Sequence, residues 1–325
     1  MSFAIIAGVW TKQKPSTLRT ERWLIGATML LAFSLRVYRL AGQSIWYDEG
    51  LSIYYARRRL PELLALVSGS DHPPLYFLLL HLWLRGTAFG QPATEYLVRY
   101  PSVIFGVLLA PLIYVFGRQL LGEHAGLLAA LLIAISPFHV WYSQETRMYT
   151  LVAVLTLWAS YALLSNLQSP TPNLQYPIPN THYPLPTTRS SLATYCLTMT
   201  LALYAHFYAT LILLAHAVFV TWWAWRRGRW RAWARWAGAS AVAVLLFLPW
   251  GGLVAGQLRA NDTYWRGTLA LGRTISHTAQ AFAVGETISG HMAIAATLAY
   301  LLLGAIALLA TKPVVTTVVT TSAVR

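Results

Sequence analysis

Eight apolar stretches of nearly membrane-spanning length constrain the fold of this chain more than any other feature of its sequence. They cover residues 23–40, 101–117, 124–141, 148–165, 192–206, 207–225, 236–253 and 291–311. A helix needs about 20 predominantly apolar residues to cross the hydrocarbon core of a membrane, where it satisfies its own backbone hydrogen bonds. The pattern therefore predicts an all-α fold, a polytopic transmembrane helical bundle with about eight spans.

The composition excludes several classes of protein. Apolar residues make up 57% of the chain and charged residues only 10%, whereas soluble domains have about 25% charged residues. A water-soluble globule, a disordered chain and a nucleic-acid-binding protein are therefore not expected. The single cysteine, Cys196, rules out an intrachain disulfide and a zinc site built on cysteines.

Two clusters of basic residues indicate how the chain crosses the membrane. They are Lys12, Lys14, Arg19 and Arg22 before the first span, and Arg226, Arg227, Arg229, Arg231 and Arg235 before the seventh. Short loops rich in Lys and Arg stay on the cytoplasmic side. This rule places residues 42–100, 142–147 and 254–290 outside, and it predicts a multi-pass protein of the plasma (cell inner) membrane.

Whether the apolar stretch 75–89 crosses the membrane decides on which side every later segment lies. It is short and contains His81 and Arg85, so we interpret it as an interfacial helix of the first outer loop, with its apolar face in the lipid. A true crossing at this point is the alternative, and it would invert every later span.

Composition and pattern divide the chain into consecutive parts. Residues 1–10 are too short to span, and no small-residue cleavage site follows a clear apolar core, so no cleaved signal peptide is expected. A Pro-rich polar stretch is typical of a linker. The parts are a cytoplasmic N-terminal segment (1–22), a first membrane module (23–165) with the outer loop 42–100, a Pro-rich cytoplasmic linker (166–190), further spans (191–311) with the outer loop 254–290, and a low-complexity tail (312–325).

Eight of the ten acidic residues fall on the predicted outer side. The sequence Trp46-Tyr47-Asp48-Glu49 directly follows the first span, and Ser70-Asp71-His72-Pro73-Pro74 lies later in the same loop. A carboxylate held near the interface can act as a general base toward a hydroxyl acceptor. The alternative is a solvated polar loop, and spacing alone does not decide between the two.

Further polar motifs lie at the outer ends of later spans. Glu145 and Arg147 belong to the connector SQETRMY, and Arg99 opens the second span. An arginine there either extends toward the surface or binds a phosphate with its fork of donors. His206 lies between aromatic residues at a tight turn, and Trp250 follows a proline. Both fit ordinary interfacial packing as well as sugar binding.

The order of these motifs resembles a known enzyme family. SIWYDE after Arg36, then DHPPLY, RYPS and YSQETRMY follow one another as in the dolichyl-phosphate-mannose–protein mannosyltransferase-like family of GT-C glycosyltransferases, which includes the bacterial aminoarabinose transferase. The resemblance covers roughly residues 20–270. It implies a GT-C catalytic module at 23–165 and an enzyme that moves a sugar from a polyprenyl-phosphate donor to an acceptor hydroxyl at the outer face, with inversion.

The resemblance also implies roles for individual residues. Asp48 is expected to be catalytic with Glu49 beside it, and Glu145 is the acidic candidate in the next outer loop. The expected donor phosphate-binding residues are Arg99, His72 and Arg147, and the expected substrate-binding residues are Trp46, Tyr47, Asp71, His206 and Trp250.

The expected partners are a polyprenyl-phosphate-linked sugar donor, a lipid, glycan or protein acceptor, and membrane lipid. No cofactor is implied and no metal ligand is assigned, although a divalent cation held by carboxylates stays compatible with the sequence. P-loop, GxGxxG, HExxH and GxSxG motifs are absent. The alternatives are a non-catalytic or truncated relative and a lipid or solute transporter; a transporter is disfavoured because the spans contain almost no acids.

Overall fold

The computed structural model describes residues 15–70, 72–87, 94–168, 188–260, 270–285 and 290–310. Every regular element in these ranges is an α-helix, which confirms the predicted all-α class for this part of the chain. In chain order the helices are α1 (Pro15–Val37), α2 (Tyr47–Ala56), α3 (Leu60–Ser68), α4 (Leu75–Thr87), α5 (Glu95–Leu121), α6 (Glu123–Ile135), α7 (Pro137–Ser143), α8 (Tyr149–Gln168), α9 (Thr188–Ala205), α10 (Ala209–Arg227), α11 (Trp230–Ala260), α12 (Leu271–Val284) and α13 (His291–Ala310).

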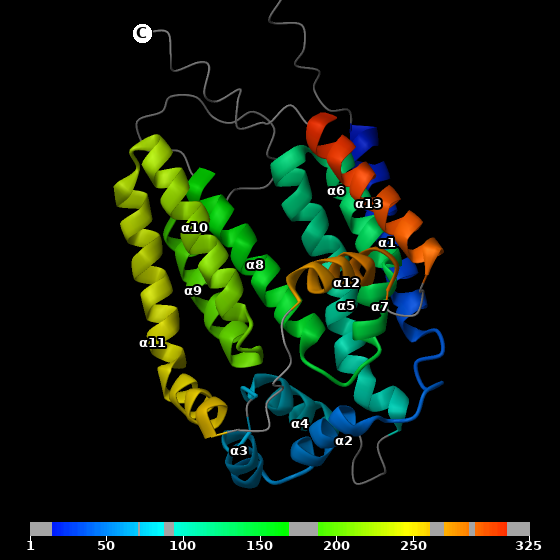
Figure 1. The fold of residues 1–325 in the computed structure, drawn as a ribbon, viewed down its shortest axis with the longest axis vertical. Helices are drawn as coiled ribbons and strands as arrows, with labels where there is room; N and C mark the ends of the chain where they lie inside the picture. Colours follow the sequence, from blue (N-terminus) through cyan, green and yellow to red (C-terminus); the bar gives the residue numbers. More distant parts are fainter. Residues whose placement is uncertain are drawn as a thin grey trace, which may run out of the picture.

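The long helices form two groups that meet where α5 packs against α8 (Figure 1). In the first group α1, α5 and α6 pack together, and α12 lies against α7. In the second group α9 contacts both α8 and α11, and α10 packs beside α11. A buried apolar cluster, which includes Tyr76, Met148, Tyr195 and Phe247, runs from α4 through α8 and α9 into α11. This cluster fixes the short helix α4 on the end of the second group.

Four described helices are long and apolar enough to cross a membrane, namely Glu95–Leu121, Tyr149–Leu167, Ala209–Arg227 and Trp230–Gln257. A fifth crossing results if α6 and α7 form one bent span. These helices support a multi-pass membrane protein. Helices α1, α9 and α13 coincide with three more of the predicted stretches, and the total of about eight spans stays a prediction.

The predicted span 124–141 is broken rather than continuous. Helices α6 and α7 are bent by 58°, and Ser136 between them has an extended backbone. Pro137 explains the break, because proline has no N–H to donate and disfavours helical geometry in the residue before it. The last carbonyls of α6 are consequently left without helical donors.

Three short helices, α2, α3 and α4, lie together at one end of the bundle (Figure 1). Helix α4 has 13 residues, which gives it a length of about 20 Å, too short to cross the hydrocarbon core. Its apolar side chains Tyr76, Phe77, Leu80 and Leu84 are buried in the protein. The expectation that this apolar face lies in lipid is therefore wrong, because the face packs against the neighbouring helices instead.

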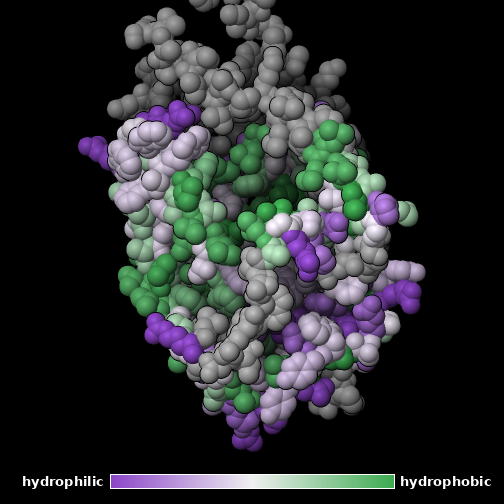
Figure 2. Space-filling view, viewed as in Figure 1, coloured by the Kyte–Doolittle hydropathy of each residue, from purple (hydrophilic) through white to green (hydrophobic). Residues whose placement is uncertain are grey.

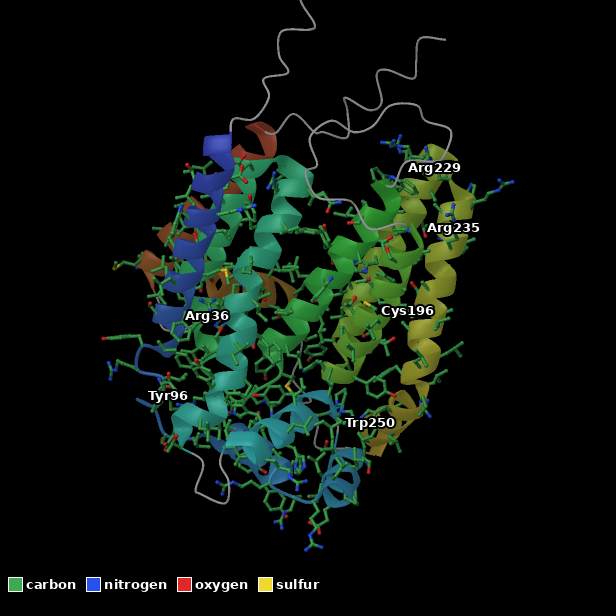
Figure 3. All side chains as sticks on the ribbon, turned by 180° about the vertical axis from the view of Figure 1, so that it is seen from behind. Arg36, Tyr96, Cys196, Arg229, Arg235 and Trp250 are labelled. Atoms are coloured by element: carbon green, nitrogen blue, oxygen red, sulfur yellow. The ribbon has the colours of Figure 1, made fainter. Side chains whose placement is uncertain are left out.

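The two ends of the bundle differ in the charged groups they present. Figure 2 shows hydrophobic side chains across much of the visible face and hydrophilic ones gathered at its lower end, over α2 and α3. In Figure 3, Arg229 and Arg235 lie at the end opposite to Tyr96 and Trp250. The predicted cytoplasmic arginine cluster and the predicted outer loop thus occupy opposite ends of the helices. Which end faces outward stays a prediction.

Candidate active site

Helix α2 begins with the two adjacent acids, and it points them in different directions. Asp48 and Glu49 occupy its first turn, where the unpaired N–H groups and the helix dipole favour negative charge. Successive helical residues differ in direction by about 100°. Glu49 is fully buried, whereas the side chain of Asp48 is 35% exposed. The two carboxylates therefore cannot have the same role.

Glu49 forms a buried ion pair with Arg99 of α5. Arg99 Nε donates to Glu49 Oε1 at 2.8 Å, and Arg99 Nη2 donates to Oε2 at 2.7 Å. The backbone N–H groups of Thr146 and Trp46 complete the shell of the carboxylate, at 2.8 and 3.4 Å. Burial by itself raises the pKa of Glu49, but the hydrogen bond from Arg99, the bond from Thr146 and the charge of Arg99 together lower it. Glu49 is thus held ionised as a structural anion.

Arg99 uses all its donors within the protein. Besides the two bonds to Glu49, its Nη1 donates to the carbonyls of Leu40 and Gln43, and its Nη2 donates to that of Ser44. A guanidinium has five N–H donors, so these contacts occupy every one. Arg99 therefore fastens the segment between α1 and α2 onto α5.

Arg147 is the guanidinium that lies beside Asp48. It belongs to the turn between α7 and α8, and its Nη2 lies 3.6 Å from Asp48 Oδ2. The same Nη2 donates to His72 Nε2 at 2.9 Å. Because arginine can only donate, His72 accepts at Nε2 and has its proton on Nδ1. Among the described residues, Arg147 Nε has no hydrogen-bond partner, although the arginine side chain is only 5% exposed. Arg147 thus keeps a donor that no described residue uses.

Aromatic rings and a second histidine surround this pair. The rings of His72 and His206 are 6.2 Å apart, and the ring of Tyr149 lies 6.3 Å from His206 and 5.9 Å from the Arg147 guanidinium carbon. Trp250 of α11, which is labelled in Figure 3, donates from its indole to the carbonyl of His72 at 3.4 Å. The segments that contain His72, Arg147, His206 and Trp250 are therefore linked by one continuous set of contacts.

Glu145 lies two residues before Arg147 and is only partly buried. Trp141 donates its indole N–H to Glu145 Oε1 at 2.8 Å. Burial raises the pKa of Glu145 to about 7; the bond from Trp141 opposes this rise, and the negative charge of Glu49 adds to it. This carboxyl group is consequently close to half-protonated at neutral pH.

Two of the predicted substrate-binding residues are not part of this cluster. The side chains of Trp46 and Tyr47 are exposed at the surface, at 45% and 80%. Asp71 lies outside the described residues. No structural finding tests their roles in substrate binding.

Sequence reasoning gave no role to several residues that support the cluster. Ser52, one turn after Asp48 on α2, lies 3.5 Å from Arg147 Nη1. Ser102 of α5 donates to the Arg147 carbonyl at 3.1 Å and bonds to Tyr76. The spacing of four between Asp48 and Ser52 was a usable signal, because residues four apart share a helix face. Ser102 and Tyr149 were inside recognised motifs, but their contacts depend on helix packing.

No group of three or more His, Cys, Asp or Glu side chains within the described ranges is arranged to hold a metal ion. The polar cluster instead combines one carboxylate, one guanidinium and two imidazoles around aromatic rings. Such a set suits an oxygen-rich, partly anionic substrate, because arginine binds phosphate and aromatic rings stack on sugars.

A sequence comparison shows which protein family part of this chain is similar to. Residues 71–176 match the sequence model of the family described as dolichyl-phosphate-mannose-protein mannosyltransferase. The matched range, about a third of the chain, includes His72, Arg99, Glu145 and Arg147 but ends before His206. The predicted family resemblance is thereby confirmed over this range, and it supports membrane glycosyltransferase activity of the GT-C type. No curated protein gave a significant match to the chain.

Proposed function

We propose that this protein transfers a sugar from a polyprenyl-phosphate donor to an acceptor hydroxyl at the outer face of the membrane. The observation that carries the proposal is the pairing of a partly exposed carboxylate, Asp48, with a buried guanidinium, Arg147, at 3.6 Å. A glycosyl transfer of this kind needs a base for the acceptor proton and a cation for the leaving phosphate. The family match over residues 71–176 supports the same reaction class.

In the proposed mechanism Asp48 is the general base. Its carboxylate removes the proton from the acceptor hydroxyl while that oxygen attacks the anomeric carbon. The bond between this carbon and the phosphate oxygen breaks on the opposite side, and its electron pair stays on the phosphate. A single displacement of this type inverts the anomeric centre. Glu49 is the weaker candidate for the base, because all its contacts are with Arg99 and backbone N–H groups.

Arg147 is the proposed site of the leaving phosphate. Its Nε is a buried donor without a partner among the described residues, and negative charge grows on the phosphate as the sugar departs. Donors that are already in place stabilise that charge without reorganisation. His72 would assist by orienting the guanidinium through its Nε2. Arg99 was also expected to bind this phosphate, but its five donors are occupied by Glu49 and three carbonyls.

The polyprenyl tail would stay in the apolar part of the bundle. Figure 2 shows that the visible face is hollowed between the two helix groups, and hydrophobic side chains border the hollow. A lipid tail in such a place keeps its apolar surface out of water. The enzyme would then bind the donor without extracting it from the membrane. His206, Tyr149 and Trp250 would surround the sugar.

The test is sugar transfer by the purified protein in lipid vesicles, with a panel of polyprenyl-phosphate-linked sugars as donors. Replacement of Asp48 by Asn is expected to lower turnover about 100- to 10,000-fold, the usual contribution of a general base. The matched control is Glu62→Gln, which alters an exposed carboxylate of α3 in the same outer loop. Retained turnover in Asp48→Asn, or an equal loss in the control, would refute the assignment of the base.

A further inference from the structure

The break between α6 and α7 leaves backbone carbonyls that need donors from elsewhere. Pro137 has no N–H, so it cannot donate to the carbonyl of Ile133 as a helical residue would. Arg36, at the end of α1, supplies the missing donors. Its Nη2 donates to Ile133 O at 3.1 Å, and its Nη1 donates to Ala134 O at 3.0 Å. The side chain of Arg36 is fully buried.

The same arginine also fixes the residues that lead into the Arg147 turn. Arg36 Nε donates to Ser143 Oγ at 3.0 Å, at the last residue of α7. The side chain of Gln144 donates to the carbonyls of Arg36 and Tyr38, at 3.0 and 2.9 Å. Two consecutive residues, directly before Glu145, are therefore tied to the end of α1. Figure 3 shows Arg36 on this helix.

A glycine on α5 gives a second, independent sign of this arrangement. A Cβ atom at Gly106 would lie 2.8 Å from Arg36 Nε and in collision with the side chain of Ser143. Real Cβ atoms essentially never have neighbours this close. The contact between Arg36 and Ser143 thus occupies the space that any other residue at position 106 would need.

We propose that Arg36 is a positioning residue, which holds the turn 144–147 so that Arg147 faces Asp48. The effect on activity rests on the proposed function, because Arg147 is there the residue that binds the leaving phosphate. The positional effect itself does not depend on that reaction. Among the described residues, Arg36 has no hydrogen bond to Asp48, His72 or Arg147, and it acts through Ser143 and Gln144.

The direct test is hydrogen exchange of the peptide spanning residues 144–148, measured without substrate. In this turn the Thr146 N–H is bonded to Glu49, and the Arg147 N–H is bonded to the Glu145 carbonyl. Arg36→Lys retains a charge but cannot reach Ile133 O, Ala134 O and Ser143 Oγ together. Ser143→Ala removes the bond to Arg36 Nε and the bond from Ser143 to the His139 carbonyl. Both variants are expected to raise exchange in this turn by about tenfold or more. Gly106→Ala is expected to have the same effect by displacing Ser143.

The controls separate a positional effect from general destabilisation. Arg22→Lys alters an exposed arginine near the start of the same helix, so exchange in the turn is expected to be unchanged. Exchange in α10 serves as the internal reference for all variants. Unchanged exchange at 144–148 in folded Arg36→Lys and Ser143→Ala protein would overturn the proposal. An increase of equal size in α10 would also overturn it, because Arg36 would then support the whole bundle.

Kinetics with a polyprenyl-phosphate sugar donor distinguish this proposal from the proposed function. Ser143→Ala is expected to lower kcat/KM about 10- to 100-fold, the usual cost of a small displacement of a reacting group. Most of this loss should come from an increase in KM for the sugar donor and little from a decrease in kcat. Arg36→Lys is expected to change KM and kcat in the same proportion. If the turn loosens but the unaltered protein transfers no sugar, the positional role stands and the proposed function fails. If transfer occurs and neither variant changes KM for the donor, the effect of Arg36 on the reaction is refuted.

Discussion

Glu49 of α2 and Arg99 of α5 form a doubly hydrogen-bonded ion pair that is almost entirely removed from solvent. The pair joins α2 to α5, a candidate membrane span, across 50 residues of sequence. Asp48, the neighbouring acid, is directed instead toward Arg147. The ion pair therefore holds α2 in the rotation that presents Asp48 to the candidate active site.

Removal of one partner from this pair is expected to destabilise the protein strongly. Arg99→Ala leaves the buried Glu49 carboxylate and three carbonyls without their donor, and the loss of one member of a buried ion pair costs about 3–5 kcal/mol. The measurement is the apparent melting temperature in detergent, with the exposed Arg57→Ala as control. Arg99→Ala combined with Glu49→Ala is expected to cost less than the sum of the two single variants. Additive single effects would contradict a direct pair.

Arg147 is expected to determine affinity for the donor. Arg147→Ala removes a charged hydrogen-bond donor, worth about 1.5–3 kcal/mol, so KM for the polyprenyl-phosphate sugar should rise about 10- to 100-fold. Arg147→Lys should recover only part of this loss, because an ammonium lacks the planar fork of donors. The measurement is the initial rate against donor concentration. The exposed Arg85→Ala on α4 is the matched control. An unchanged KM in Arg147→Ala would contradict the phosphate role.

The sequence was sufficient to predict the helices and the motifs but not the partners of their side chains. Apolar length alone predicted the stretches that became α5, α8, α10 and α11. Asp48 and Glu49 are adjacent, so no spacing rule could tell which of them would meet Arg99. That choice depends on the rotation of α2 against α5, which tertiary packing decides.

The role of the two arginines was hidden for the same reason. Arg99 and Arg147 both lie at predicted outer ends of spans, and both looked able to bind phosphate. The carbonyls of Leu40, Gln43 and Ser44 occupy Arg99, and their direction is a property of the folded chain between α1 and α2. The break at Pro137 could be predicted in part from the sequence, since proline disfavours helix in the residue before it. The bonds from Arg36 to the carbonyls at this break could not be predicted, because Arg36 lies about 100 residues earlier in the sequence.

Ser102 is expected to be more important for stability than Tyr76, to which it is bonded. Ser102 Oγ donates to the Arg147 carbonyl, so the Tyr76 hydroxyl must donate to Ser102. Ser102→Ala leaves both the Tyr76 hydroxyl and the Arg147 carbonyl buried without partners, at about 1–3 kcal/mol for each such group. Tyr76→Phe removes the hydroxyl itself and leaves the bond to Arg147 intact. The apparent melting temperature should fall clearly further in Ser102→Ala, and equal falls would contradict this order of bonds.

Glu145 is expected to make stability depend on pH around neutrality. Its pKa is raised to about 7 by burial, so the folded protein binds a proton there that the unfolded chain releases at its ordinary, lower pKa. The contribution of this group to stability is fully present at acidic pH and is lost as pH rises through about 7. Glu145→Gln keeps an uncharged side chain at every pH and should remove this loss. The apparent melting temperature of Glu145→Gln should therefore exceed that of the unaltered protein at pH 8 and match it near pH 5. The control Glu62→Gln should match the unaltered protein at both pH values. A variant that loses stability on alkalinisation as steeply as the unaltered protein would show that another group causes the dependence.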